Sequence, residues 1–359
     1  MNFERLARIR EQMQFLNFDH LVITSSDSVF YLIDEEIQPG ERLLALSITL
    51  DACALVISGL FPMQKDLGLP VIYYKDTEDS VRILSDLIKV NSRIGIDKNW
   101  QSHFLLRLMK LHPQSTFENG SPAIDNIRLC KDIEETERLR EASQINDKVM
   151  LAVMDYIKEN AETGQLTEID VQKKVIEFNA LLGVHEMSFT PTVCFGKNGA
   201  EPHHDCDGTI LNPNDSIVVD IGGRLKGYCS DMTRSFVLGT PTEKYKEIYN
   251  LVLEANLKAI SVVKPGVKLC DVDRAAREVI ENGGYGDYFT HRTGHGIGIN
   301  VHEFPDVSEI SETICEVGMA FSIEPGIYLL GEFGVRIEDI VMVTENGCEV
   351  LNKVNKVLE

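Results

Sequence analysis

The chain has 359 residues, of which 43% are hydrophobic and 25% charged, a composition typical of a soluble globular protein and too long for one average domain. Its 56 acidic and 35 basic residues give a formal net charge of −21. Because the backbone of a nucleic acid and an anionic membrane surface would both repel such a chain, we expect neither of them as a partner.

The N-terminal stretch and the cysteines both favour the cytoplasm. Residues 1–10 form a charged amphipathic pattern rather than a signal peptide, and no apolar run approaches the roughly 20 residues of a membrane-spanning helix. The eight cysteines lie far apart, and no Cys-x-x-Cys pair indicates zinc binding or redox chemistry. We therefore expect reduced thiols in a cytoplasmic protein.

The first third of the chain predicts an α/β domain that covers residues 1–126. Apolar residues recur at helical spacing over residues 3–15 and again over residues 81–90. Short apolar runs that predict strands alternate with these helices, at residues 21–24, 29–33, 42–50, 52–58, 71–74 and 93–97. The glycine at position 95 lacks the spaced partners of a dinucleotide-binding turn, so we expect no nucleotide cofactor.

A second domain is predicted from residue 127 to residue 359. Helices are expected over residues 133–157, from the capping residue Thr167 to Leu182, and over residues 243–263 and 271–281. A strand candidate at residues 189–195 leads into a polar, glycine-punctuated loop that ends in His203 and His204.

Two aspartates interrupt the arms of a predicted β-hairpin. The apolar run 217–219 reads as a buried strand, glycines over 222–227 supply turn chemistry, and a second strand runs to Leu238. Asp220 lies in the first arm and Asp231 in the second. Buried carboxylates are almost always paired or bound to a cation, so we expect a positive group between them unless both lie at exposed strand ends.

Three histidines and two glutamates add to this pattern. His291, His295 and His302 fall within twelve residues, with glycines beside the middle one where the backbone must approach another group closely. Glu324 and Glu338 each lie seven positions from Gly331, so a hairpin centred on that glycine would place them opposite each other on one face. Two unpartnered glutamates there would repel, which again indicates a cation.

These residues together predict a dinuclear metal site. The charges of four carboxylates are balanced by two divalent cations, and bridging carboxylates can hold two metals with a hydroxide ready for hydrolysis. The oxygen-rich ligand set favours Mn²⁺, with Co²⁺ or Zn²⁺ as alternatives. The expected ligands are Asp220, Asp231, His295, Glu324 and Glu338.

Five motifs of the chain stand in the order found in the pita-bread metallopeptidases. They are Val219-Asp-Ile-Gly, Ser230-Asp-Met-Thr-Arg-Ser-Phe, Gly294-His-Gly-Ile-Gly, Ile323-Glu-Pro-Gly-Ile-Tyr and Val335-Arg-Ile-Glu-Asp. The chain resembles the proline-specific branch, Xaa-Pro dipeptidase (prolidase) and aminopeptidase P. That resemblance implies a creatinase-like α/β domain over residues 1–126 and an α+β pita-bread catalytic domain over residues 127–359. It further implies a homodimer that hydrolyses small peptides with proline at the second position.

The resemblance also implies a role for each site residue. Asp231 and Glu338 would bridge the two metals, Asp220 would bind one of them, and His295 with Glu324 would bind the other. Glu324 would in addition accept the proton of the metal-bound water.

The remaining roles concern the substrate. His203 lies seventeen residues before Asp220 and matches a histidine near the scissile nitrogen, with neighbouring His204 as the alternative. The resemblance implies that His302 faces the substrate carbonyl, that His291 lines the proline side of the pocket, and that Arg336 supports the bridging Glu338.

Three other kinds of protein fit the sequence less well: two other hydrolases and an inactive binding protein. Methionine aminopeptidase resembles only the second half of the chain. Creatinase hydrolyses without metal and would not be expected to keep all five ligands, and a catalytically inactive pita-bread protein that binds peptides would normally lose some of them. The sequence leaves dipeptidase and aminopeptidase activity as two open alternatives.

Overall fold

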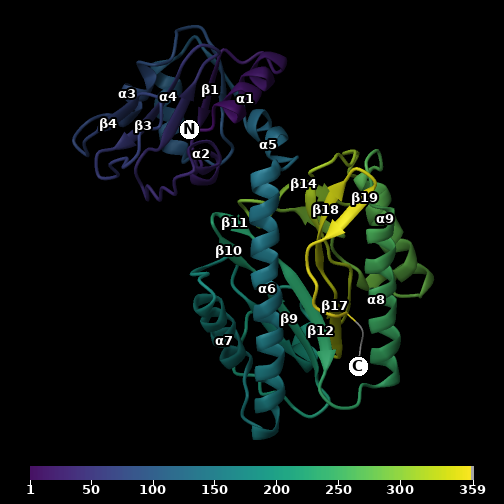
Figure 1. The fold of residues 1–359 in the computed structure, drawn as a ribbon. Coiled ribbons are helices and arrows are strands. Elements are labelled where there is room, and N and C mark those ends of the chain that lie inside the picture. Colours follow the sequence, from purple (N-terminus) through teal and green to yellow (C-terminus); the bar gives the residue numbers. More distant parts are fainter. Residues whose placement is uncertain (357–359) are drawn as a thin grey trace. The chain divides into compact units, whose positions relative to one another are not determined.

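A computed structural model describes residues 1–356, which divide into two compact units, Met1–Arg128 and a second unit that starts at Leu129 (Figure 1). No helix within this described part is long and apolar enough to cross a membrane. The cysteines at positions 53, 194, 206, 229, 270, 315 and 348 are free thiols, as the sequence predicted.

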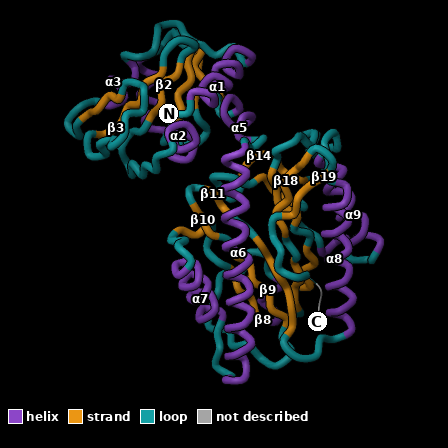
Figure 2. The backbone as a smooth tube through the Cα atoms, viewed as in Figure 1, coloured by secondary structure: helices purple, strands orange, loops and turns teal. Residues whose placement is uncertain are grey.

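The first unit is built on one mixed sheet of six strands in the order β4-β3-β2-β1-β5-β6 (Figure 2). Buried side chains of the central strands, including Val22, Val56 and Ile94, pack against Leu84 and Leu108 of two helices. The strands are β1 (His20–Ile23), β2 (Ala45–Ile48), β3 (Cys53–Ser58), β4 (Val71–Tyr74), β5 (Arg93–Ile96) and β6 (Thr116–Asn119). The helices are α1 (Phe3–Phe15), α2 (Ser26–Ile33), α3 (Ser80–Ser85), α4 (Ser102–Leu111) and α5 (Pro122–Arg128).

Two predicted elements of this unit are wrong in type or length. The apolar run 29–33, predicted as a strand, lies in helix α2, whose N-cap Ser25 accepts a hydrogen bond from the backbone N–H of Ser28 at 3.1 Å. Residues 28–33 are all buried, and an apolar run that is buried on every side does not distinguish a short helix from a strand. The predicted helix 81–90 ends earlier, at Ser85.

The second unit places helices on both sides of several small sheets (Figure 1). Helices α6 and α7 pack together on one side and α8 and α9 on the other. The helices are α6 (Ile133–Asn160), α7 (Glu168–Leu181), α8 (Glu243–Val262) and α9 (Leu269–Asn282), with short 3-10 turns η1 (Ala161–Thr163), η2 (Gly196–Ala200) and η3 (Gly286–Tyr288). Thr167 caps α7 in a capping box with Asp170, so the predicted start of this helix is confirmed.

The strands of the second unit form four sheets, three of which carry the site residues. The strand orders are β12-β9-β8, β11-β10-β7, β14-β13-β15-β18-β19 and β16-β17. The strands are β7 (Glu186–Met187), β8 (Thr192–Phe195), β9 (Ser216–Ile221), β10 (Gly223–Leu225), β11 (Tyr228–Cys229), β12 (Met232–Val237), β13 (Gly294–Gly296), β14 (Glu303–Val307), β15 (Ala320–Ile323), β16 (Gly326–Leu329), β17 (Phe333–Arg336), β18 (Asp339–Thr344) and β19 (Gly347–Val350).

Both predicted hairpin pairings are present. Strand β9 pairs antiparallel with β12, which sets Asp220 opposite Thr233, although residues 223–229 form strands of a separate sheet rather than a simple turn. Ile323 pairs with Asp339 and Gly326 with Arg336, so the two glutamates between these pairs stand opposite each other. Gly331 has a φ of 80°, which a residue with a Cβ rarely adopts, and it forms the turn of this second hairpin.

Candidate active site

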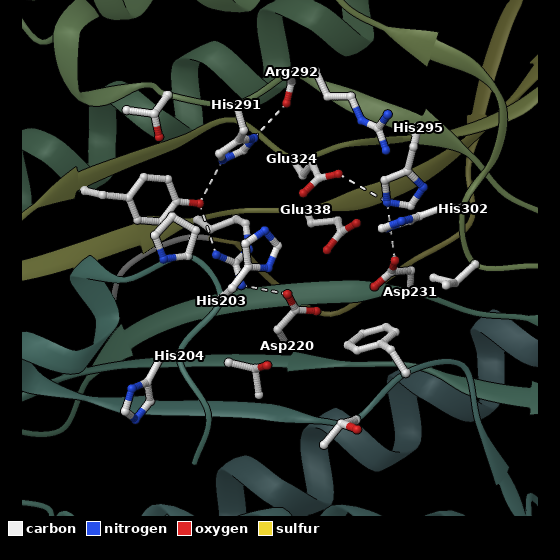
Figure 3. Close-up of a pocket in the computed structure, with 18 of the residues that line it drawn as sticks. His203, His204, Asp220, Asp231, His291, Arg292, His295, His302, Glu324 and Glu338 are labelled. Atoms are coloured by element: carbon white, nitrogen blue, oxygen red, sulfur yellow. Dashed lines mark hydrogen bonds and ion pairs between the residues drawn. The ribbon is translucent and has the colours of Figure 1, made fainter. Parts of the chain in front are cut away.

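The five expected metal ligands line one cavity of about 770 Å³ in the second unit (Figure 3). Asp220 comes from β9 and His295 from β13. Asp231 directly precedes β12, Glu324 directly follows β15, and Glu338 directly precedes β18. Residues more than a hundred positions apart are therefore brought together by strand pairing, and every one of them faces the same cavity.

Three of the ligands are especially close. One potential ligand atom each from Asp231, His295 and Glu338 lies within 4.8 Å of the others, and all three side chains are buried. His295 Nε2 lies 3.2 Å from a carboxylate oxygen of Glu324 and 3.7 Å from one of Asp231. His295 Nδ1 lies 3.1 Å from the carbonyl oxygen of Gly296, to which it can only donate. Nε2 therefore faces two carboxylates: a protonated Nε2 can donate to Glu324, whereas a deprotonated Nε2 presents a lone pair that can bind a metal ion.

Several buried carboxylate oxygens have no partner. Oδ1 of Asp220, Oδ1 of Asp231 and Oε1 of Glu338 receive no hydrogen bond from any residue of the described chain. Burial and then the neighbouring carboxylates raise the pKa of Asp231 and of Glu338 well above the ordinary range, and burial raises that of Asp220. Leaving such an oxygen unsatisfied costs about 1–3 kcal/mol or more. Divalent cations that prefer oxygen ligands would fit this arrangement.

Glu324 differs from the other three carboxylates. Burial by itself raises its pKa, but a hydrogen bond from His295 and the positive charges of His295, His291 and Arg336 lower it to about 2. Its carboxylate also accepts a hydrogen bond from Ser322 Oγ at 3.0 Å. Glu324 is therefore held ionised and in a fixed orientation at the edge of the close cluster.

Arg336 supports the site through Asp220 and Thr233. Its Nη2 donates to Asp220 at 2.6 Å, and its Nε donates to Thr233 Oγ1 at 3.1 Å. Thr233 in turn donates to Glu338 at 2.8 Å. The expected support of Glu338 by Arg336 thus runs through the threonine hydroxyl, while the direct ion pair is with Asp220.

His291 and Tyr328 form a polar group beside Arg336. The hydroxyl of Tyr328 lies 2.9 Å from His291 Nε2 and accepts a hydrogen bond from Arg336 at 3.0 Å. Burial lowers the pKa of His291 and raises the pKa of Tyr328 to about 12. Sequence analysis assigned no role to Tyr328. Its place in the motif Ile323-Glu-Pro-Gly-Ile-Tyr, which also carries Glu324, was a usable signal.

The remaining histidines occupy different environments. The ring of His302 lies 4.1 Å from that of His295 between centroids, and burial followed by the charge of His295 lowers the pKa of His302 to about 4. In Figure 3, His203 lies among the side chains of the metal ligands, whereas His204 stands apart from them. His204 Nε2 instead lies 2.8 Å from a carboxylate oxygen of Glu168, which is fully buried. The structure thus distinguishes the two neighbouring histidines, although the cavity wall includes both.

Comparison with known proteins identifies the family. Residues 137–345 match the profile of metallopeptidase family M24, and residues 5–130 match that of the creatinase/prolidase N-terminal domain. This chain belongs to metallopeptidase family M24. As an M24 member it has the two-domain architecture that the motifs predicted, a creatinase-type N-terminal domain followed by a pita-bread catalytic domain, so the predicted fold class is confirmed.

Relatives of this M24 protein cover its whole length. An uncharacterised peptidase of Staphylococcus haemolyticus is 35% identical and covers 98% of this chain and 99% of that protein. Two solved structures each have a TM-score of 0.90: the prolidase from Pyrococcus horikoshii, 31% identical over 99% of this chain and 100% of that one, and the Xaa-Pro dipeptidase from Bacillus anthracis, 30% identical over 99% of each.

Proposed function

We propose that this M24 metallopeptidase hydrolyses the Xaa-Pro bond at the N-terminus of small peptides, as an Xaa-Pro dipeptidase or Xaa-Pro aminopeptidase. The observation that carries the proposal is the group of buried carboxylate oxygens without partners around His295, in a cavity that is also lined by four further histidines. The prolidase and Xaa-Pro dipeptidase structures that match the whole chain support the proline specificity.

Two divalent cations would be held by the five ligands Asp220, Asp231, His295, Glu324 and Glu338. When bound, such cations polarise a scissile carbonyl and lower the pKa of a water molecule. Mn²⁺ suits the oxygen-rich set best, with Co²⁺ and Zn²⁺ as the other candidates. We assign Asp231 and Glu338 to the bridging positions because both belong to the close, buried group with His295 and each has one oxygen without a protein partner.

The other side chains act on the substrate and its protons. Glu324, ionised and fixed by Ser322, would accept the proton of the attacking water. An Xaa-Pro bond is a tertiary amide, so its leaving nitrogen must be protonated, and His203, which lines the cavity, would do this. His302 would hydrogen-bond the carbonyl oxygen, and His291 with Tyr328 would face the pyrrolidine ring.

The proposal extends to the state of the protein. We propose a homodimer, on the basis of the family resemblance, and a cytoplasmic location, which the free thiols support because unpaired cysteines are typical of reducing compartments.

Product analysis tests the proposed reaction. The chelated protein, loaded again with Mn²⁺, is expected to cleave an Xaa-Pro dipeptide or an Xaa-Pro-Yaa tripeptide, and the preferred substrate decides between dipeptidase and aminopeptidase. Binding of both peptides without cleavage would instead support the inactive binding protein, and cleavage of unblocked Met-Ala peptides alone would support a methionine aminopeptidase.

Replacement of single histidines tests the assigned roles. His203→Ala is expected to keep the metal content of the wild type while kcat falls by about 10² to 10⁴, the range for a lost proton-transfer group. His295→Ala is expected to lose metal, because its Nε2 faces Asp231 and Glu324. Wild-type turnover in His203→Ala would contradict the role given to this histidine.

A further inference from the structure

Glu168 is a further buried acidic residue, and it is not one of the proposed metal ligands. Glu168, the first residue of α7, is fully buried, and each of its two oxygens accepts two hydrogen bonds. Oε1 accepts from the backbone N–H of Phe195 at 2.7 Å and from Asn198 at 3.0 Å. Oε2 accepts from His204 at 2.8 Å and from the backbone N–H of Asp207 at 3.1 Å. The carboxylate thus gathers four donors that all lie between positions 195 and 207.

The donors explain why this position requires a carboxylate. A carboxylate offers acceptors on both oxygens, whereas an amide replaces one oxygen with a group that only donates. In Glu168→Gln, one pair of donors would therefore face another donor. Hydrogen bonds to an ionised acceptor are also about twice as strong as those between neutral groups, so the charge contributes directly to holding this segment.

The same segment is fixed on its other side by β17. A Cβ placed on Gly334 of β17 would lie 1.9 Å from the carbonyl oxygen of Gly199 in η2, so the two backbones touch. The backbone N–H of Glu168 also donates to the carbonyl of Thr209 at 3.2 Å. The loop that carries His203 is therefore clamped between the start of α7 and the strand that ends in Arg336.

We propose that Glu168, with His204, is a positioning residue that holds His203 at the leaving nitrogen of the substrate. His204 follows His203 directly, so its hydrogen bond to the buried carboxylate fixes the backbone from which the His203 side chain projects. This inference rests on the role of His203 in the proposed function. Because a misplacement of about 1 Å can cost about 10² in rate, the clamp matters even though Glu168 does not touch the substrate.

The main test compares Glu168→Gln with a control on the same helix turn. Glu168→Gln is expected to lower kcat by about 10-fold or more, with KM within about twofold of the wild type and both metal ions retained. Asp170→Asn is the matched control, because Asp170 lies two residues away and its side chain accepts hydrogen bonds from Thr167, the N-cap of α7. It is expected to leave kcat within about twofold.

A second pair of variants keeps the test open if Glu168→Gln does not fold. His204→Gln retains an N–H that can donate to Glu168, whereas His204→Leu removes it. We expect kcat to decrease from the wild type to His204→Gln and to decrease further in His204→Leu. Equal kcat in these two variants would overturn the proposal.

A double-mutant cycle separates this inference from the proposed function. In a His203→Ala background, Glu168→Gln is expected to cause no further loss of kcat, since a residue that acts through His203 has nothing left to position. The same 10-fold loss in both backgrounds would overturn the positioning role. If His203→Ala alone turns over at the wild-type rate, the role of His203 itself fails, which is a different outcome from additive losses.

Discussion

Two groups of acidic and histidine side chains in the second unit resemble each other in composition and differ in function. The metal cluster consists of Asp231, His295 and Glu338, and the loop cluster consists of Glu168, His204 and Asp207. Both bring potential ligand atoms within 4.8 Å of one another, so proximity alone would make either of them a metal site.

Hydrogen bonding separates the two clusters. In the metal cluster one oxygen of Asp231 and one of Glu338 have no partner within residues 1–356, whereas each oxygen of Glu168 accepts two hydrogen bonds. A buried oxygen without a partner is costly unless a ligand completes it, while a fully satisfied carboxylate holds structure by itself. Unsatisfied acceptors therefore indicate ligand binding more reliably than the number of acidic residues does.

The largest expected effect concerns loss of a carboxylate from the metal cluster. Asp231→Asn and Glu338→Gln should each lose metal and lower turnover by at least about 10³-fold, because an amide cannot serve two cations as a bridging carboxylate does. Elemental analysis and peptide cleavage measure both effects. Glu168→Gln, in the loop cluster, should keep its metal and is the control. Two ions retained per chain in Asp231→Asn would contradict the bridging assignment.

Loss of the carboxylate from the loop cluster should instead lower the stability of the protein. Glu168→Ala leaves four donors without their acceptor, so we expect the free energy of unfolding to fall by about 3–5 kcal/mol, since each unsatisfied buried donor costs about 1–3 kcal/mol and some of these four can be solvated. Denaturant titrations with and without Mn²⁺ should give the same decrease, because the loop cluster binds no metal in this interpretation. A decrease that appears only with Mn²⁺ would mean that the loop cluster is itself a metal site.

A smaller effect is expected from the charge of the metal cluster in metal-free protein. Mn²⁺ at about 100 times its Kd should raise the free energy of unfolding of the wild type by about 2.7 kcal/mol for each ion bound. Glu338→Gln should lose this gain but be more stable than the wild type without metal, because the buried glutamate no longer repels Asp231. Thermal unfolding measures both differences.

Glu345→Gln is the matched control for this comparison, since Glu345 is an exposed glutamate in the turn that follows β18. It should change neither the metal-dependent gain nor the metal-free stability by more than about 0.5 kcal/mol. A metal-free Glu338→Gln protein that is less stable than the wild type would show that Glu338 is stabilised by the protein itself.

Local patterns determined much of this protein. The family motifs, the capped start of α7 and the pairing of Glu324 with Glu338 were all predicted, because strand alternation and the position of Gly331 fix a hairpin register over a few residues. The placement of five ligands on neighbouring strands then followed from motifs in family order.

Other features depended on contacts between distant residues. The separation of His203 from His204 is set by Glu168, which lies 36 positions before His204, and the support of Glu338 by Thr233 spans 105 positions. The sequence predicted a strand where helix α2 lies, because residues 28–33 are all buried and the helix has no polar face whose spacing would indicate a helical period. The sequence by itself thus determined the family, the two-domain fold and the set of candidate ligands. Only the tertiary structure decided which carboxylates lack partners, because hydrogen-bond satisfaction depends on groups that the chain brings together from far apart.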